Sequence, residues 1–245
     1  MGGAIETIPV WRLALAFVPV AVTLVIIWRW SLGTRDALVA VARMLGQLLL
    51  IGYLLAYIFG ADSPPLVLLI LSVMLLASGW IALQPLERRS TGLFLRALGA
   101  IALGGIATLL LVTQGVLAAD PWYAPKVMIP LAGMVFANAM NAVSLAAERY
   151  TAELEAQPDP LRARRIALRA AMIPQVNALL AVGLVSLPGM MTGQILSGVS
   201  PLVAVRYQIM VMAMVFGSAG ISASAFLWWL RPGGVPGSST TEDGE

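Results

Sequence analysis

Long apolar stretches alternate with short polar segments along most of this chain. A helix rises about 1.5 Å per residue, so roughly 20 apolar residues cross the ~30 Å hydrocarbon layer of a membrane. The pattern predicts an all-α, polytopic integral membrane protein with about seven transmembrane helices, which together form one membrane domain over residues 1–231. The expected spans are 9–27, 37–59, 66–83, 97–119, 127–147, 173–196 and 202–230.

The sixth expected span contains an interruption. Pro188 and Gly189 stand in a nearly charge-free stretch, VGLVSLPGMMTGQILSGVSPLVAVRYQIMV at 182–211, where a spanning helix should continue. Lipid offers backbone groups no water to bond with, so a break at membrane depth survives only where it packs against protein or lines a cavity. We therefore expect a broken helix near Pro188-Gly189, of the kind that usually serves transport.

Composition excludes several classes of protein and of site. Of the 245 residues, 60% are hydrophobic and 11% are charged, whereas a soluble domain carries about 25% charged residues. The chain contains no Cys and no His, which rules out disulfides, imidazole or thiolate ligands, and any zinc site or catalytic triad that needs them. The net charge of +3 does not indicate nucleic-acid binding, because the arginines cluster in short loops between apolar spans.

The basic loops predict the orientation in the membrane. Lys and Arg concentrate in the loops of one side, and this excess is typical of cytoplasmic loops. The N-terminus is therefore expected outside and the C-terminus in the cytoplasm, where residues 232–245 form a disordered tail rich in Gly, Pro, Ser and acids. The basic side holds Arg29, Arg35, Arg88, Arg89, Arg96, the arginines from 149 to 169, and Arg231, and the other side holds Arg12, Lys126 and Arg206.

The one long polar stretch between spans, residues 148–172, is expected to form two helical pieces divided at 157–160. Asp159 can cap the second piece, with Pro160 in its first helical position. An apolar face and an arginine face recur in that piece at helical spacing. The result is a short basic amphipathic helix, which fits either docking on a soluble partner or lying on anionic lipid. The apolar face consists of Leu161, Leu168 and Met172, and the basic face of Arg162, Arg165 and Arg169.

No motif for ATP hydrolysis or other catalysis is found. A P-loop needs a glycine-rich turn and a Lys that reaches the phosphates. The single Lys of the chain, Lys126, lies beside prolines in WYAPKVMIP. The chain is therefore not expected to be an enzyme, and a pump built on it needs an ATPase from another polypeptide.

Polar side chains at membrane depth are candidates for a substrate pathway, because they are costly there. Arg43 and Gln47 share a face of the second span, and Asn138 and Asn141 share a face of the fifth. For Arg43 the alternative is a side chain that snorkels to the headgroups or pairs with Asp36. For the asparagines the alternative is hydrogen bonding between neighbouring helices.

Methionine is the one soft metal ligand that the chain offers. Several of its 12 methionines lie on spans that we expect to pack together, but their spacing gives no closed ligand set, so packing explains them better. Met190 and Met191 differ, because they directly follow the expected break and so have a reason to face a cavity. No metal site is expected.

The last span carries a stripe of small residues at helical spacing. Ala213, Gly217, Gly220 and Ser224 would allow a close helix contact, either between two copies of the chain or within one copy.

Three stretches together resemble a known family over nearly the whole chain. They are the broken stretch at 182–211, the run RMLGQLLLIGYLLAYIF around Arg43, and the GM and NAM pattern of the fifth span. They resemble the FetB or YbbM-like family, which implies the permease subunit of an ABC transporter that exports iron from the bacterial cytoplasmic (inner) membrane. The resemblance also implies a homodimer, a cytoplasmic ABC ATPase subunit that binds ATP and Mg, and docking of residues 161–171 on that ATPase.

The ligand chemistry and the resemblance point to different cargoes. Iron as a bare ion prefers carboxylate, imidazole or thiolate ligands, and the expected spans hold no carboxylate beyond Asp36 at an edge. The cargo is therefore expected to pass weakly along amide, hydroxyl and backbone oxygens, or to travel as an anionic or apolar metal complex that Arg43 attracts. An ABC permease for an organic or sugar-nucleotide substrate, and a non-transport membrane scaffold, remain open alternatives.

Overall fold

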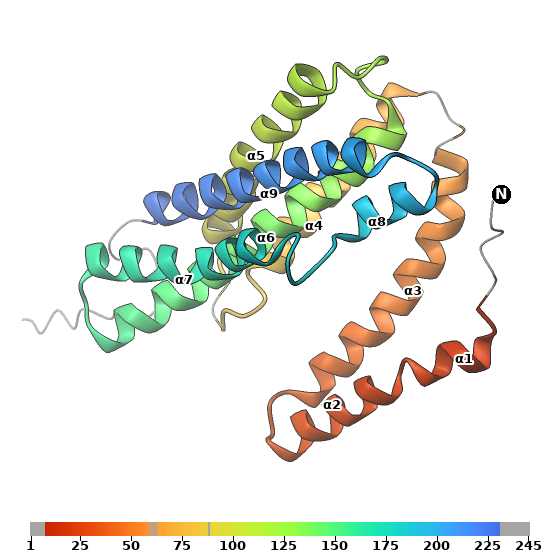
Figure 1. Cartoon of the computed structure of the whole chain (residues 1–245). Coiled ribbons are helices and arrows are strands. Elements are labelled where there is room, and N and C mark those ends of the chain that lie inside the picture. The colour runs from red at the N-terminus through yellow and green to blue at the C-terminus, as the bar shows by residue number, and fades with distance from the viewer. Residues whose placement is uncertain (1–7, 59, 61–62, 88, 231–245) are drawn as a thin grey trace, which may run out of the picture. The chain divides into compact units, whose positions relative to one another are not determined.

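The computed structural model describes residues 8–58, 60, 63–87 and 89–230 and is built from helices (Figure 1). In these ranges there is no strand, and a single isolated bridge joins Val182 to Ser186. The tail predicted at 232–245 lies outside the described residues. The elements are α1 (Val10–Leu15), α2 (Val18–Arg29), α3 (Thr34–Ile58), α4 (Pro64–Ala82), α5 (Thr91–Leu110), the π-helix η1 (Leu111–Val116), α6 (Pro125–Ala156), α7 (Pro160–Ala181), α8 (Gly189–Leu196) and α9 (Pro201–Trp229).

The chain divides into two compact units, and the first comprises residues 1–61. Its helices α2 and α3 contact each other. Neither α1 nor α2 contains a buried residue, although both are strongly apolar. An apolar helix that keeps all its side chains open needs a lipid or protein environment.

The second unit, residues 62–245, has α6 and α9 at its centre. Helix α6 contacts α4, α5, α7 and α9, and α9 also contacts α5, α7 and α8 (Figure 1). Helices approach closely in lipid where small residues line the contact. At Gly104 of α5 an added Cβ would lie 2.7 Å from the carbonyl oxygen of Ser218 and 2.9 Å from the amide nitrogen of Ser222, both on α9. This seam fixes α5 against α9.

Six segments of the described chain are long and apolar enough to cross a membrane, in agreement with the predicted all-α, multi-span architecture. The remaining predicted span, 173–196, is interrupted as expected, but the break is wider than Pro188-Gly189. Helix α7 ends at Ala181, residues 182–188 form a linker, and α8 begins at Gly189. Gly183 sits at φ +81°, a left-handed conformation that favours glycine. The helix has ended before this glycine, because Val182 already has an extended backbone (φ −63°, ψ 131°), several residues ahead of the proline.

The polar stretch 148–172 is divided between two long helices. Its first part continues α6 to Ala156, and α7 begins at Pro160 after a three-residue loop. The predicted cap is confirmed: Asp159 accepts hydrogen bonds from the backbone N–H groups of Leu161 (3.0 Å) and Arg162 (3.1 Å). Helix α7 does not stop near 172, however. It runs on to Ala181 with Pro174 inside it, so the basic segment and the start of the sixth predicted span are one helix.

Candidate functional site

A polar cavity of about 400 Å³ lies between α6 and α7, which form a hairpin. We call it the amide cavity, because three carboxamide side chains line it. Helix α6 supplies residues three to four apart, so they lie on one face, and α7 supplies the opposite wall. The lining residues are Asn138, Asn141, Ser144 and Leu145 from α6, and Pro174, Gln175 and Ala178 from α7.

The hydrogen bonds of the amide cavity leave acceptors open. The side-chain NH₂ of Asn138 donates to the backbone carbonyl of Met134 at 2.8 Å, one turn back on its own helix. Gln175 is only 7% exposed and makes no side-chain hydrogen bond within the described ranges. Amide and hydroxyl groups both donate and accept. A neutral lining of this kind can bind a polar cargo or coordinate a cation weakly, without a carboxylate.

Sequence reasoning identified half of the amide cavity. Asn138 and Asn141 were singled out, and the structure brings them together with Ser144 and Gln175, which were not. A signal for Gln175 existed, because it is an amide inside the expected span 173–196 and so falls under the same rule on polar groups at membrane depth. The position of Gln175 opposite α6 depends on how the α6–α7 hairpin folds back, and the spacing of residues along the chain does not predict it.

Arg43 and Gln47 belong to the first unit, where both lie exposed on α3. They are four residues apart and share a helix face, as predicted. The ion pair considered between Arg43 and Asp36 is not formed; the ion pair found in the described ranges joins Arg149 and Glu153. The roles of Arg43 and Gln47 in a pathway stay predictions.

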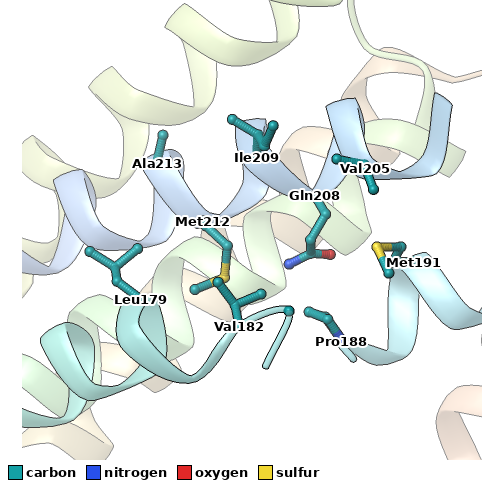
Figure 2. Close-up of a pocket in the computed structure, with 10 residues that line it drawn as sticks. Leu179, Val182, Pro188, Met191, Val205, Gln208, Ile209, Met212 and Ala213 are labelled. Atoms are coloured by element: carbon teal, nitrogen blue, oxygen red, sulfur yellow. The ribbon is translucent and has the colours of Figure 1, made fainter. Parts of the chain in front are cut away.

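Met190 and Met191 begin α8 directly after the linker, and they line different cavities. Met191 faces an apolar cavity of about 460 Å³, between the end of α7, the linker, α8 and α9 (Figure 2). Met190 lines a third cavity of about 220 Å³ with Met134 and Met210, and Lys126 also lines it. Three thioethers from three helices thus meet at one cavity, which their sequence spacing did not indicate. The ammonium of Lys126 opposes a cation there.

The basic segment packs against the rest of the chain through a third face, distinct from its predicted leucine and arginine faces. The stripe of α7 that packs inward consists of Ala163, Ala167 and Ala171, all buried. Leu161, which was assigned to the apolar face, is 66% exposed, and Leu168 is half-buried. Small side chains let α7 approach its neighbours more closely than leucine would. The predicted basic residues Arg162, Arg165 and Arg169 are exposed.

Arg164 is a residue of this segment that sequence analysis missed. It is half-buried, and its guanidinium donates a hydrogen bond to the carbonyl oxygen of Leu230, just after α9. A cation at the C-terminal end of a helix is favourable, because the last carbonyl groups lack partners within the helix. Arg164 thus ties the beginning of α7 to the end of α9.

Comparison with known proteins fits this architecture. The sequence model of the uncharacterised protein family UPF0014 matches residues 10–165 and 161–232. The chain belongs to the UPF0014 family. A relative in Escherichia coli K12, the "Probable iron export permease protein FetB", is 37% identical over 86% of each chain. The "UPF0014 membrane protein slr1647" of Synechocystis is 37% identical over 81% of this chain and 82% of its own.

A plant relative shows how far the family extends. The "Protein ALUMINUM SENSITIVE 3" of Arabidopsis thaliana is 30% identical over 88% of this chain and 84% of its own. No solved structure matches the chain. The predicted resemblance to the FetB-like family is therefore confirmed, and this member of UPF0014 is an all-α, multi-pass membrane protein. Among the described residues no three His, Cys, Asp or Glu side chains come together as a metal site would require.

Proposed function

We propose that this chain is the membrane-spanning permease subunit of an ABC transporter that exports iron or a related metal species. A separate cytoplasmic ATPase binds ATP and Mg²⁺ and supplies the energy. The similarity to the E. coli protein named as a probable iron export permease supports this proposal, since it covers 86% of both chains. The organisation of α7 supports it independently.

The observation that carries the proposal is the continuity of α7. Its exposed arginines and the Gln175 wall of the amide cavity stand on one continuous helix, with Pro174 between them. Arg165 precedes Gln175 by ten residues, or ~15 Å along the axis. Pro174 removes one backbone hydrogen bond and favours a kink just before Gln175, so a displacement of the arginine end reaches Gln175 as a movement about this proline. A partner that pushes on the exposed arginines would therefore shift Gln175 relative to Asn138 on α6.

The tether from Arg164 to Leu230 adds α9 to the moving part. Arg164 lies among the exposed arginines but points inward, so a force on the basic segment reaches the end of α9 as well as the amide cavity. In this account residues 161–169 are the surface on which the ATPase docks. The basic segment lies in the cytoplasm, the N-terminus outside, and the protein in the bacterial inner membrane.

The same account includes a homodimer, because one amide cavity and one docking surface make half of a symmetric pump. The small-residue stripe of α9 is partly open in a single chain: Ala213 and Ser224 are exposed. Gly220 is partly covered by Met172, whose methyl group would lie 3.6 Å from an added Cβ. The open part of the stripe offers a face for a second copy.

The cargo is handled by neutral groups in this proposal. The amide cavity supplies amide and hydroxyl oxygens and no carboxylate. Such ligands suit weak, sequential contact with a metal species or hydrogen bonding to an organic complex of the metal. The same lining also favours the second candidate cargo, a polar organic molecule without a metal.

Transport in inverted membrane vesicles tests the proposal. The vesicles contain this chain and its candidate ATPase, and the measurements are ATP-dependent uptake of radioactive iron and ATP hydrolysis. The wild type should accumulate iron. Arg165→Glu with Arg169→Glu should abolish uptake, and Arg206→Glu on α9, also exposed, should not. If ATP is hydrolysed but neither free nor chelated iron enters the vesicles, iron is not the cargo. If the double variant still takes up iron, residues 161–169 are not the surface on which the ATPase docks.

A further inference from the structure

The third cavity of the second unit takes no part in the proposed function, and we call it the lysine cavity. It has a volume of about 220 Å³ and lies between the first half of α6, the loop after η1, the start of α8, and α9. Lys126 is the single charged residue in its described lining, and Met134, Met190 and Met210 form much of the apolar wall. This volume is below the ~300–1,000 Å³ of drug-sized sites, so the cavity suits a small molecule.

One face of α6 joins the lysine cavity to the amide cavity. Lys126, Pro130 and Met134 line the first cavity, and Asn138 and Asn141 line the second. Steps of three or four residues keep all five on the same side of the helix. From Lys126 to Asn141 this face is ~22 Å long, which is most of the ~30 Å hydrocarbon layer. The face therefore leads from one cavity to the other along the direction in which a cargo would cross.

The fixed charges at both ends of this face are positive. Arg165 and Arg169 lie exposed on α7 before the amide cavity, and Lys126 lies at the opposite end. In the described part of the chain no Asp or Glu side chain lines either cavity. Lys126 forms no ion pair there, since the one found joins Arg149 and Glu153. An ammonium group without a counter-charge attracts anions and repels a free metal cation.

Tyr207 of α9 supplies a second hydrogen-bond donor to the lysine cavity. Its hydroxyl makes no hydrogen bond to another described residue. The ammonium of Lys126 can donate three hydrogen bonds and the phenol of Tyr207 one, so together they can bind oxygen atoms of an anion. Both side chains are exposed, and exposed charges bind weakly because water screens them. Weak binding suits a site from which a cargo is released.

We propose that the lysine cavity is a second site for the cargo, and that it binds an anionic, oxygen-rich complex of the metal in place of the bare ion. Lys126 and Tyr207 donate hydrogen bonds to oxygen atoms of the complex, and the thioether wall packs against the rest of it. Neither cavity supplies a carboxylate, so the metal brings its own oxygen ligands. The inference rests on the proposed function, because it takes the ligand of this site to be the cargo.

Equilibrium binding to the full chain in phosphatidylcholine nanodiscs, without the ATPase, tests the site. The probe is radioactive gallium citrate, an anionic chelate of a redox-inert trivalent metal, and radioactive manganese(II) chloride is the bare-cation comparison. The wild type should bind the chelate and not manganese. Lys126→Gln should lower the affinity for the chelate about tenfold and Tyr207→Phe about two- to fivefold, whereas Lys126→Arg should retain it. Added salt should weaken binding to the wild type more than binding to Lys126→Gln.

Arg206→Gln is the matched control. Arg206 precedes Tyr207 in the sequence and is exposed, but it does not line the lysine cavity. Loss of the same charge there should change the affinity for the chelate less than twofold. Equal losses in Lys126→Gln and Arg206→Gln would show a general attraction of anions to this surface and overturn the site.

Two other results would overturn the proposal. One is a wild type that binds manganese or fails to bind the chelate. The other is displacement of the chelate by dihexanoyl phosphatidylglycerol at concentrations at which dihexanoyl phosphatidylcholine has no effect, because the ligand would then be a lipid headgroup. Neither ATP nor the ATPase enters this measurement, so a failure of binding leaves the proposed function standing, and a failure of transport leaves the binding result standing.

Discussion

Replacing Gly104 by alanine should destabilise the second unit, because at this glycine the backbone of α9 lies directly against α5. The added Cβ would meet the side-chain oxygen of Ser222, the carbonyl oxygen of Ser218 at 2.7 Å and the amide nitrogen of Ser222 at 2.9 Å. Real Cβ atoms essentially never approach heavy atoms below 3.0 Å. Two of the three contacts involve helix backbone, so a rotated serine cannot relieve them and the helices must separate.

The expected magnitude follows from two opposing effects. Inserting a methyl group into a tight contact costs about 1–3 kcal/mol, and a backbone contact on a central helix belongs at the upper end. Alanine regains up to ~1 kcal/mol of helix propensity over glycine. The free energy of unfolding should therefore fall by ~1–2 kcal/mol. Gly92→Ala in the same helix, where no heavy atom lies within 4 Å, is the matched control and should be neutral or slightly stabilising.

Thermal and chemical unfolding of the purified protein in detergent micelles, followed by tryptophan fluorescence, measures the difference. The double variant Gly104→Ala with Ser222→Ala removes the side-chain contact but keeps both backbone contacts, so it should recover little of the loss. Wild-type stability of Gly104→Ala, or full recovery in the double variant, would refute the packing of α5 on α9 described here.

Three further outcomes follow from single side chains. Asp159→Ala removes the cap of α7 and should cost about 1 kcal/mol, measurable as faster hydrogen exchange at residues 160–164, whereas Asp159→Asn should retain protection. Gln175→Leu should lower iron uptake in vesicles while ATP hydrolysis continues. Asn177→Leu, which changes an exposed residue of the same helix, should leave uptake unchanged. Equal uptake by the two variants would mean that the amide cavity takes no part in transport. Gln208 of α9 is buried, and its side-chain oxygen has no hydrogen-bond partner in the described part of the chain, so Gln208→Leu should raise the melting temperature of the protein; a lower melting temperature would mean that the oxygen is satisfied.

Local signals in the sequence predicted the elements well. Apolar length gave the spans, and Asp159 followed by Pro160 gave the start of α7. The break near Pro188 was also predicted, but α7 already ends at Ala181, where the extended backbone of Val182 precedes the left-handed Gly183. A proline in an apolar run predicts a helix break, whereas a single glycine in such a run does not predict one by itself.

The sequence did not predict which residues of different helices contact one another. Spacing identified a leucine face and an arginine face on α7, but the face that packs inside the chain is made of alanines, because close approach to neighbouring helices selects small side chains over large ones. The meeting of Asn138 with Gln175 depends on how the α6–α7 hairpin folds back, 37 residues apart along the chain. Arg164 looked like one of several surface arginines until its partner at Leu230 was seen.

The central claim is that a force on the basic end of α7 changes the amide cavity. The chain has no cysteine, so spin labels can be attached at Ser144→Cys and Ala178→Cys, on opposite walls of the cavity, and their separation measured by pulsed electron paramagnetic resonance with the ATPase present. ATP should produce a second distance population, and Arg165→Glu with Arg169→Glu should abolish it. If the ATPase binds and hydrolyses ATP but the distance between the two spin labels does not change, the account is contradicted.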